Sequence, residues 1–261
     1  PSPDHQHHHA TRAALIDLTG TKNPTMYFEA NRTYGHLRVY VWGADDSYQK
    51  LFDAGAGGIP YYKRYAVDLT KFAGHKIHLR FSALPSSPIA SCKIRNLVFK
   101  EREPVKVVKH THAFKPNDWW HEGGWHYDNN AQRHELNGTV PASYQMMYSK
   151  MKIDLTGLNK PLFSFFETRG NVARYIYVSE NGKDWTKVLY LGAGNDAIER
   201  KQTIDLSKYK GKQIYIGFYG YPYTTNNWWR VRNMSFHDPI TINNLAAGTV
   251  LSTKHFDVEG L

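Results

Sequence analysis

The chain carries one 84-residue unit twice, in a single unbroken register. Ile-Asp-Leu-Thr-Gly stands at residues 16–20 and again at 153–157, an offset of 137 residues (153 minus 16). The same offset links Gly-Ala-Gly at 55–57 and 192–194, and Arg-Asn at 95–96 and 232–233. Repeats of about 20–50 residues build solenoids, whereas a unit of this size is a complete folded module. We therefore expect two related modules, matched over residues 16–99 and 153–236.

The strongest local pattern is that of β-strands. Residues 36–42 place Leu or Val at every second position, and residues 214–219 alternate Ile or Phe with Tyr or Gly, the period of two that indicates a strand. Turn signals such as Asn-Gly at 181–182 and the Gly-rich stretch at 56–58 separate such runs. A weak helical pattern occurs near residues 195–200. The sequence predicts an all-β fold of β-sandwich modules.

The composition limits the kinds of partner that we expect for this chain. At 261 residues the length fits two domains of about 150 residues each. An apolar content of 41%, with 14% aromatic residues, is enough for packed cores. No apolar run approaches the roughly 18 residues of a membrane span, so we expect no membrane insertion. The net charge of +10 favours anionic partners. Because no tight basic block occurs, a solubilising surface is the simpler interpretation, and we expect no nucleic-acid partner.

A charged segment that ends in proline, residues 100–104, predicts the end of the first module. Only fifteen residues precede the first repeated unit, so we expect that copy to lack the entry segment that the second has at 105–152. Near the end of the chain, residues 249–256 echo 107–114, which predicts the opening strand of a third module in a longer protein. The His-rich start, residues 1–9, is typical of a processed end or a tag remnant and carries no argument about the fold or a metal. The predicted segments are a first module at 1–103, a second at 104–239, and a tail at 240–261.

Several short motifs follow one another in a constant order. In the second module these are Phe114, Gly-Trp at 124–125, Ile-Asp-Leu-Thr-Gly at 153–157, Val-Ser-Glu-Asn-Gly-Lys-Asp-Trp at 178–185, an Ile-Asp-Leu-Ser segment from 204 to Lys212, and Trp-Arg-Val-Arg-Asn-Met at 229–234. This order resembles the cleaved-adhesin (choice-of-anchor J) domains, which are related to MAM domains. These domains occur in the haemagglutinin/adhesin regions of gingipain-type secreted bacterial proteases. The resemblance covers most of residues 105–237 and, more loosely, 16–99, where Ala-Asp-Asp at 44–46 replaces the Asn-Gly turn.

The resemblance implies a jelly-roll sandwich with a non-catalytic binding role on a secreted or cell-surface protein. Its implied partners are host proteins or glycans, with other modules of the same protein as a further possibility. Several family members hold calcium through acidic residues near the closing strand. Here Arg-Asn occupies that place in both copies, and Lys115 follows Phe114 where the family has an acidic residue. Because calcium prefers six to eight oxygen ligands, we expect no metal ion and no cofactor.

Histidine and cysteine features do not assemble a catalytic site. Residues 121–126 read His-Glu-Gly-Gly-Trp-His, but a zinc-protease helix needs histidines four apart, and two glycines break a helix. We therefore predict a loop there. His110 and His112 could share one face of a strand, and exposed strand histidines are the simpler interpretation than a metal pair. Cys92 aligns with Trp229, so we expect it to pack inward as a small hydrophobe. We predict that the chain is not an enzyme.

The two copies differ most in one aromatic loop. Residues 219–229 read Tyr-Gly-Tyr-Pro-Tyr-Thr-Thr-Asn-Asn-Trp-Trp, whereas the matching residues 82–92 contain no aromatic residue. The fold does not require these rings, which favours a binding role in which rings stack on sugars and amides bond to hydroxyls. The candidate ligand-binding residues are Tyr221, Tyr223, Asn226, Asn227 and Trp228, together with Trp119 and Trp120, which we expect to be exposed. Trp229 and Trp125 are expected in the core.

The sequence thus favours non-catalytic, adhesin-type binding modules that recognise host proteins or glycans. Two alternatives stay open. One is a carbohydrate-binding module attached to a secreted hydrolase or protease, and the other is an inert spacer that displays a neighbouring domain.

Overall fold

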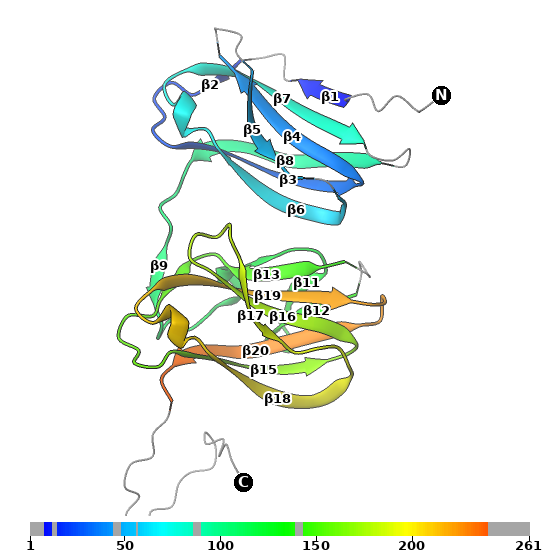
Figure 1. The fold of residues 1–261 in the computed structure, drawn as a ribbon, viewed down its shortest axis with the longest axis vertical. Coiled ribbons are helices and arrows are strands. Elements are labelled where there is room, and N and C mark those ends of the chain that lie inside the picture. Colours follow the sequence, from blue (N-terminus) through cyan, green and yellow to red (C-terminus); the bar gives the residue numbers. More distant parts are fainter. Residues whose placement is uncertain are drawn as a thin grey trace, which may run out of the picture.

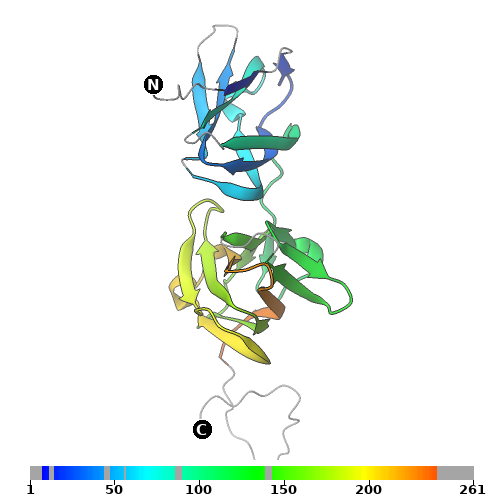
Figure 2. The same ribbon diagram turned by 90° about the vertical axis from the view of Figure 1, so that its right-hand side faces the viewer.

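The computed structural model describes residues 8–11, 15–43, 48–55, 57–85, 90–138 and 143–239. The predicted all-β class is confirmed: two β-sandwiches follow one another along the chain, with an extended connection between them (Figures 1 and 2). The helical elements within the described residues are three 3-10 turns, η1 (Thr70–Phe72), η2 (Pro116–Asp118) and η3 (Ser207–Tyr209). In the part of the chain that is described, no helix has the length and apolar character needed to cross a bilayer.

The first sandwich contains eight strands: β1 (His8–Thr11), β2 (Ile16–Asp17), β3 (Pro24–Thr33), β4 (Gly35–Trp42), β5 (Gln49–Asp53), β6 (Ile59–Asp68), β7 (Lys76–Pro85) and β8 (Ser91–Glu101). One sheet has the order β1-β7-β4-β5, with β2 also paired to β7, and the other has the order β6-β3-β8. Strand β1 lies partly in the His-rich start that sequence reasoning set aside.

The second sandwich contains twelve strands: β9 (Val107–Lys109), β10 (Trp119–His121), β11 (Trp125–Asp128), β12 (Arg133–Asn137), β13 (Gln145–Ser149), β14 (Lys152–Asp154), β15 (Leu162–Arg169), β16 (Val172–Ser179), β17 (Thr186–Tyr190), β18 (Asp196–Asp205), β19 (Gln213–Pro222) and β20 (Trp228–His237). Its first sheet joins β10-β13-β19-β14-β9, with β16 paired to β19 and β17 to β16. Its second sheet has the order β11-β12-β20-β15-β18.

The 137-residue offset that relates the two sequence copies also relates the residue pairs of their strands. Thr25 faces Asp68 between β3 and β6, and Leu162 faces Asp205 between β15 and β18. The match extends upstream of the repeated sequence, because β1 pairs with β7 in the register in which β13 pairs with β19. Strands β10, β11 and β12 have no counterpart among the described residues of the first sandwich. Accordingly β8 pairs with β3, whereas β20 pairs with both β15 and β12.

The repeated Ile-Asp-Leu motif has a direct structural explanation. In the second copy, Ile153 and Leu155 are fully buried. The carboxylate between them, Asp154, accepts a hydrogen bond of 2.9 Å from the backbone N–H of Thr156, which turns the chain out of the strand. The first copy forms the same 2.9 Å bond from Thr19 to Asp17. The motif therefore combines two inward apolar anchors with a carboxylate that caps the turn.

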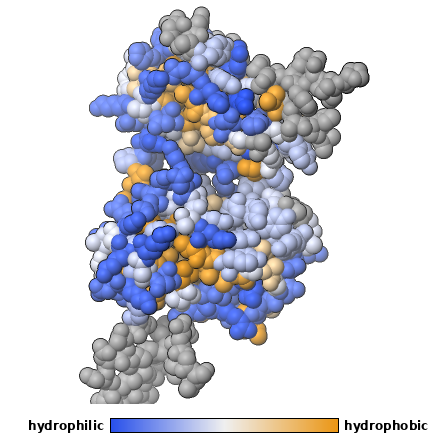
Figure 3. All heavy atoms as spheres, viewed as in Figure 1, coloured by the Kyte–Doolittle hydropathy of each residue, from blue (hydrophilic) through white to orange (hydrophobic). Residues whose placement is uncertain are grey.

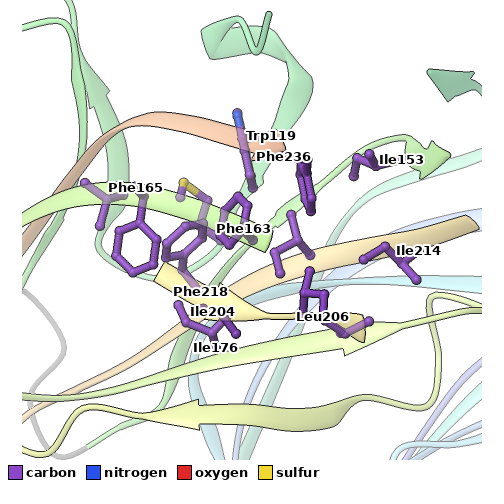
Figure 4. Packing of buried hydrophobic residues seen from close by; sticks show 14 of the residues in the cluster. Trp119, Ile153, Phe163, Phe165, Ile176, Ile204, Leu206, Ile214, Phe218 and Phe236 are labelled. Carbon is purple, nitrogen blue, oxygen red and sulfur yellow. The ribbon is translucent and has the colours of Figure 1, made fainter. Parts of the chain in front are cut away.

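Each sandwich has its own hydrophobic core. The first is built around Met26, Phe28 and Leu37, and the second around a larger aromatic group. In the second core, Phe163, Phe165, Phe218 and Phe236 lie together from both sheets (Figure 4). Phe165 and Phe218 meet edge to face at 5.0 Å, a favourable arrangement for aromatic rings.

One sequence expectation is wrong at this level. Residues 195–200, which carry the weak helical pattern, lie mostly in β18, which pairs with β15 through contacts such as Glu167 opposite Arg200. Many of its side chains are exposed, so the polar pattern reflects an edge strand that faces water on one side. The echo of a third module at 249–256 and the turn at 44–46 lie outside the described residues.

A buried ion pair lies inside the second sandwich. The Arg174 guanidinium donates to the Glu167 carboxylate, and both side chains are essentially inaccessible to solvent. The Trp229 indole N–H also donates to Glu167 at 2.7 Å, and Arg174 donates at 2.6 Å to the carbonyl of Leu191 in the β17–β18 connection. In the first copy the matching positions are apolar, Ala30 for Glu167 and Leu37 for Arg174.

In the first sandwich, a different arginine bonds to the corresponding connection, between β5 and β6. Arg32 donates to the carbonyls of Ala54 at 2.7 Å and Gly55 at 2.6 Å, which correspond to Leu191 and Gly192. In both copies, therefore, a guanidinium donates hydrogen bonds to the backbone carbonyls at this turn. Both guanidinium groups are buried, but the one in the second copy comes from a neighbouring strand and is also paired with the buried Glu167 carboxylate.

We expect Glu167→Ala to lower the free energy of unfolding of the second sandwich by about 3–5 kcal/mol, because Arg174 would stay buried without its carboxylate partner. Urea unfolding followed by tryptophan fluorescence measures the loss. The control is Glu199→Ala, which removes a surface carboxylate paired with Arg232 and should cost about 0–1 kcal/mol. Equal losses in the two variants would contradict the assigned role of the buried pair.

Candidate functional site

Tyrosines crowd the outer face of one sheet of the second sandwich. Side chains alternate along a strand, so Ile176 and Val178 of β16 point into the core while Tyr175 and Tyr177 point out. Strand β19 and the segment before β13 add more rings on the same side. We call this set the tyrosine face; its members are Tyr144, Tyr175, Tyr177, Tyr190, Tyr219, Tyr221 and Tyr223.

The rings of the tyrosine face touch one another across four adjacent strands. Tyr144 lies near the centre, with ring centroids 5.1 Å from Tyr219, 4.7 Å from Tyr221 and 5.9 Å from Tyr175. At one edge, Tyr175 and Tyr190 stack at 4.8 Å with an interplanar angle of 23°. Such contacts stabilise aromatic pairs by about 0.5–1.5 kcal/mol beyond their buried area, so the rings form a mutually braced surface.

The first sandwich shows that the shared fold does not need this surface. The cross-strand pair that matches Tyr175 and Tyr190 is Arg38 and Asp53, an ion pair at 2.9 Å. Ser82 takes the place of Tyr219. The two sandwiches thus keep the same register and inner face but differ in the chemistry of this outer face.

The tyrosine face is open to solvent in part. Exposed fractions are 45% for Tyr144, 53% for Tyr190 and 47% for Tyr223. Partial burial raises the pKa of Tyr219 to about 12. Its phenol therefore stays protonated at physiological pH, and its hydroxyl can both donate and accept hydrogen bonds. On the second module's side of the junction many spheres are pale, the shade that Tyr and Trp take on this hydropathy scale (Figure 3).

The first sandwich meets the second beside the tyrosine face. The Tyr61 hydroxyl of β6 donates to the backbone carbonyl of Tyr144 at 2.7 Å. The Arg64 guanidinium, also from β6, lies 4.0 Å from the centre of the Trp120 ring, and the Lys150 ammonium lies 4.4 Å from the same ring. Trp120 therefore lies between two cations and helps to join the modules.

A cleft of about 320 Å³ opens at this junction. Its lining residues are Lys63, Arg64, Glu122, Met146, Tyr148, Tyr177, Gly182, Lys183, Trp185 and Tyr219. The tyrosine face supplies two of these residues, and the first sandwich supplies Lys63 and Arg64. The cleft and the tyrosine face are therefore one continuous site.

Glu122 is the buried polar group of the cleft. It is 5% exposed, and burial raises its pKa to about 7. The backbone N–H of Arg64 and the Tyr148 hydroxyl bond to it, and Lys63 attracts its charged form. Glu29 of β3 acts in the opposite sense, since its negative charge favours the protonated form of Glu122. The carboxyl group thus links the two modules and changes charge near neutral pH.

The aromatic loop identified from the sequence is divided between two sheets. Tyr221 and Tyr223 join the tyrosine face, with ring centroids 5.2 Å apart. Asn226 is exposed and Asn227 is half-buried beside them. Trp228 starts β20 in the opposite sheet, where the Arg230 guanidinium covers its ring at 4.1 Å.

The expectation that Trp119 is exposed is wrong. Trp119 is 1% exposed and packs in the core against Phe114 and Phe218. The reason is alternation along β10, in which Trp119 points inward and Trp120 outward. The core placements of Trp125 and Trp229 are confirmed, at 4% and 0% exposed.

Other expected features fall into place without forming a reactive site. His110 and His112 follow the end of β9 in a turn, so their predicted strand position is wrong, and His112 bonds to Asp118 at 2.9 Å. The loop predicted at 121–126 is confined to residues 122–124, where Gly123 has a φ of 69°, because His121 ends β10 and Trp125 begins β11. Within the described ranges, no three His, Cys, Asp or Glu side chains gather as a metal-binding group. Cys92 is partly buried against the first core.

The Arg-Asn positions at the closing strands also have a structural role. Asn96 and Asn233 adopt φ values of 53° and 52°, the left-handed conformation that asparagine tolerates at a bulge. Arg95 pairs with Glu29 at 2.8 Å, and Arg232 pairs with Glu199. Each carboxylate at this edge therefore faces a guanidinium.

Sequence reasoning missed most of the tyrosine face. It selected Tyr221 and Tyr223 but not Tyr144, Tyr175 or Tyr177. A signal was present, because Tyr alternates with Ile and Val at 175–178, and Tyr recurs at every second position from 219 to 223. Such alternation marks one face of a strand, but it does not show which strands lie side by side.

No protein-family model matches the chain, including any of the cleaved-adhesin type, and no curated protein matches it. Among solved structures, the tandem CBM22-1–CBM22-2 domain of Paenibacillus barcinonensis Xyn10C is similar over 84% of this chain and 79% of that chain, with 7% identity and a TM-score of 0.33. A CBM4 structure is similar over 46% of this chain and 94% of that chain, with 13% identity and a TM-score of 0.33.

A third similar structure concerns carbohydrate-binding modules of promiscuous specificity from the β-sandwich superfamily. It matches 90% of this chain and 99% of that chain, with 10% identity and a TM-score of 0.30. These three neighbours are carbohydrate-binding β-sandwich modules, whereas other similar structures include an allantoicase. At this degree of similarity they carry no argument about the ligand of this chain, which rests on the chain's own residues.

The raised pKa of Glu122 predicts a pH-dependent stability. Between pH 4.5, the ordinary pKa of the group, and about pH 7, the folded chain holds a proton that the unfolded chain has released. Stability from this group is therefore full at low pH and is lost as the pH rises through this window, by at most about 3 kcal/mol. The measurement is the free energy of unfolding of wild type and Glu122→Gln at pH 5 and pH 8.

Glu122→Gln serves as the reference protein because two buried histidines change the stability with pH in the opposite direction. Burial lowers the pKa of His121 to about 4 and of His134 to about 3, and the two rings share a hydrogen bond of 2.9 Å. Below pH 6.5 the unfolded chain gains protons at these sites first, so acid destabilises the fold through them. Wild type should lose more stability than Glu122→Gln between pH 5 and pH 8. An identical pH profile for both proteins would contradict the role given to Glu122.

Proposed function

We propose that this chain is a non-catalytic carbohydrate-binding protein whose tyrosine face holds a saccharide. The observation that carries the proposal is the replacement of the Arg38–Asp53 pair of the first sandwich by the stacked pair Tyr175–Tyr190 in the second. Seven tyrosines on one outer face contribute nothing to the inner packing that both copies share. A surface that the fold does not require is best explained by a ligand.

The chemistry of the face suits a sugar. Aromatic rings offer flat apolar surface to the C–H faces of pyranose rings, and phenol hydroxyls bond to sugar hydroxyls. Adjacent strands lie about 4.8 Å apart, so rings on four strands form a platform that spans more than one sugar unit. Asn226 is exposed three residues after Tyr223, and its amide can add hydrogen bonds.

We further propose that the units at residues 1–103 and 104–239 act together as a secreted or surface-displayed binding pair. Both modules line the site, since β6 of the first sandwich lies beside Tyr144. The adhesin interpretation differs in its partner, a host protein in place of a free glycan. An inert spacer would bind neither class of ligand.

We expect Tyr175→Ala to weaken binding to a responsive oligosaccharide at least tenfold, because it removes a ring that contacts Tyr144 and Tyr177 and leaves Tyr190 without its stacking partner. A glycan array followed by calorimetry on the best ligand measures the change, in which tenfold corresponds to about 1.4 kcal/mol. Tyr34→Ala is the matched control, since Tyr34 is 53% exposed and belongs to the turn between β3 and β4 of the first sandwich.

Three results would count against the proposal. Absence of binding to every saccharide would favour the spacer, and binding only to host proteins would favour the adhesin. Equal affinities for wild type and Tyr175→Ala would place the ligand elsewhere on the molecule.

A further inference from the structure

We propose that the cleft between the two modules selects saccharides that carry an anionic group, a carboxylate or a sulfate, through Lys63 of the first module and Lys183 of the second. This inference rests on the proposed function, because it assigns a ligand class to one end of the same site. It adds a requirement that neither module meets alone.

The cleft combines one aromatic wall with cations from two directions. Trp185, Tyr177 and Tyr219 line it from the second sandwich, where Tyr177 and Tyr219 also belong to the tyrosine face. Lys63 reaches it from β6, and Lys183 from the hairpin between β16 and β17. A sugar ring that lies on the aromatic wall would therefore place its substituents between two ammonium groups of opposite modules.

The other charged lining residues are already occupied. The Arg64 guanidinium covers the Trp120 ring, which leaves it positioned to add positive potential rather than a direct contact. Glu122 is buried and bonded to the Arg64 backbone and to Tyr148. With Glu122 protonated, the lining carries three positive charges and no negative one. Asp68 of β6 lies outside this lining; it attracts Lys183 and is also paired with Arg102 at 3.4 Å. A cleft lined by charges of one sign concentrates ions of the other sign.

The position of the two lysines also explains why the sequence composition does not reveal a positive site. The net charge of +10 is spread over the whole chain, and no basic block occurs. Lys63 and Lys183 are 120 residues apart (183 minus 63) and meet because the first sandwich docks on the second. The positive site is a product of the junction.

The test uses the full chain and matched saccharide pairs. An oligogalacturonate is compared with its methyl ester, and a sulfated galactan oligosaccharide with its unsulfated form, so that each pair differs only in the anionic group. We expect the anionic member to bind at least tenfold more tightly in about 50 mM salt, with the preference falling as salt rises. The two pairs separate carboxylate from sulfate recognition, and a preference within either pair supports the inference.

The double variant Lys63→Gln/Lys183→Gln should lose this preference while its affinity for the neutral member stays within about twofold. Lys208→Gln, an exposed lysine in η3, is the control and should leave the preference intact. Circular dichroism confirms that each variant is folded.

A second readout uses pH. Lowering the pH from 8 to 6 protonates Glu122. The titratable groups that act on it are Lys63, Tyr61 and Tyr65 of β6, Tyr148 of β13, Tyr219 of β19 and Glu29 of β3, and the Arg64 backbone bonds to it. Anionic saccharides should therefore bind more tightly at pH 6 in wild type, and Glu122→Gln should abolish this change. Equal binding of charged and neutral members, or a preference that survives the double lysine variant, overturns the inference but leaves the carbohydrate proposal standing. Absence of binding to any saccharide overturns both.

Discussion

The alternation of side chains across paired strands is the constraint on which the rest of this molecule depends. Each strand of a sandwich presents one face to the core and one to water, and the register between strands decides which residues become neighbours on each face. Both sandwiches keep one register, so most inward positions are apolar in both copies, with the buried pair Glu167 and Arg174 as an exception in the second. The outer faces are free to differ. The tyrosine face is the clearest result of that freedom. Arg38, Asp53 and Ser82 occupy three of its positions in the first copy, whereas Tyr40 matches Tyr177.

Inside the second sandwich, the buried charged groups of Glu167 and Arg174 are bonded to partners close to them. The carbonyls of the β17–β18 connection are bonded to a guanidinium, as they are in the first sandwich, but the arginine comes from another position in the chain. Both arginines are buried, but in the second sandwich the Arg174 guanidinium and the Trp229 indole N–H both donate to the buried Glu167 carboxylate. A buried pair of this kind contributes little net stability compared with apolar packing, yet loss of one partner is costly. The cost of losing either partner therefore restricts which residues can replace Glu167 or Arg174 alone.

The junction joins structure to the proposed function. Three interactions hold β6 of the first sandwich beside the second: the Tyr61 hydroxyl on the Tyr144 carbonyl, Arg64 on Trp120, and the Arg64 backbone on Glu122. These contacts place two modules around one cleft, so a ligand that enters it touches both. The arrangement favours a ligand that is longer than one sugar unit, with part of it on the tyrosine face and part between the modules.

The sequence by itself determined the duplication, the all-β class, the turn motifs and the core positions of Trp125 and Trp229, because each of these follows from residue identity and period along one strand. It also pointed to Tyr221 and Tyr223, through their absence from the first copy. Only the tertiary structure decided that Tyr144, Tyr175, Tyr177 and Tyr190 lie with them, and that Trp119 does not. A sequence shows which side of its own strand a residue takes relative to its neighbours, but strand order and module docking arise from contacts between distant segments. For that reason a surface built across four strands, and a cleft shared by two modules, became visible only in three dimensions.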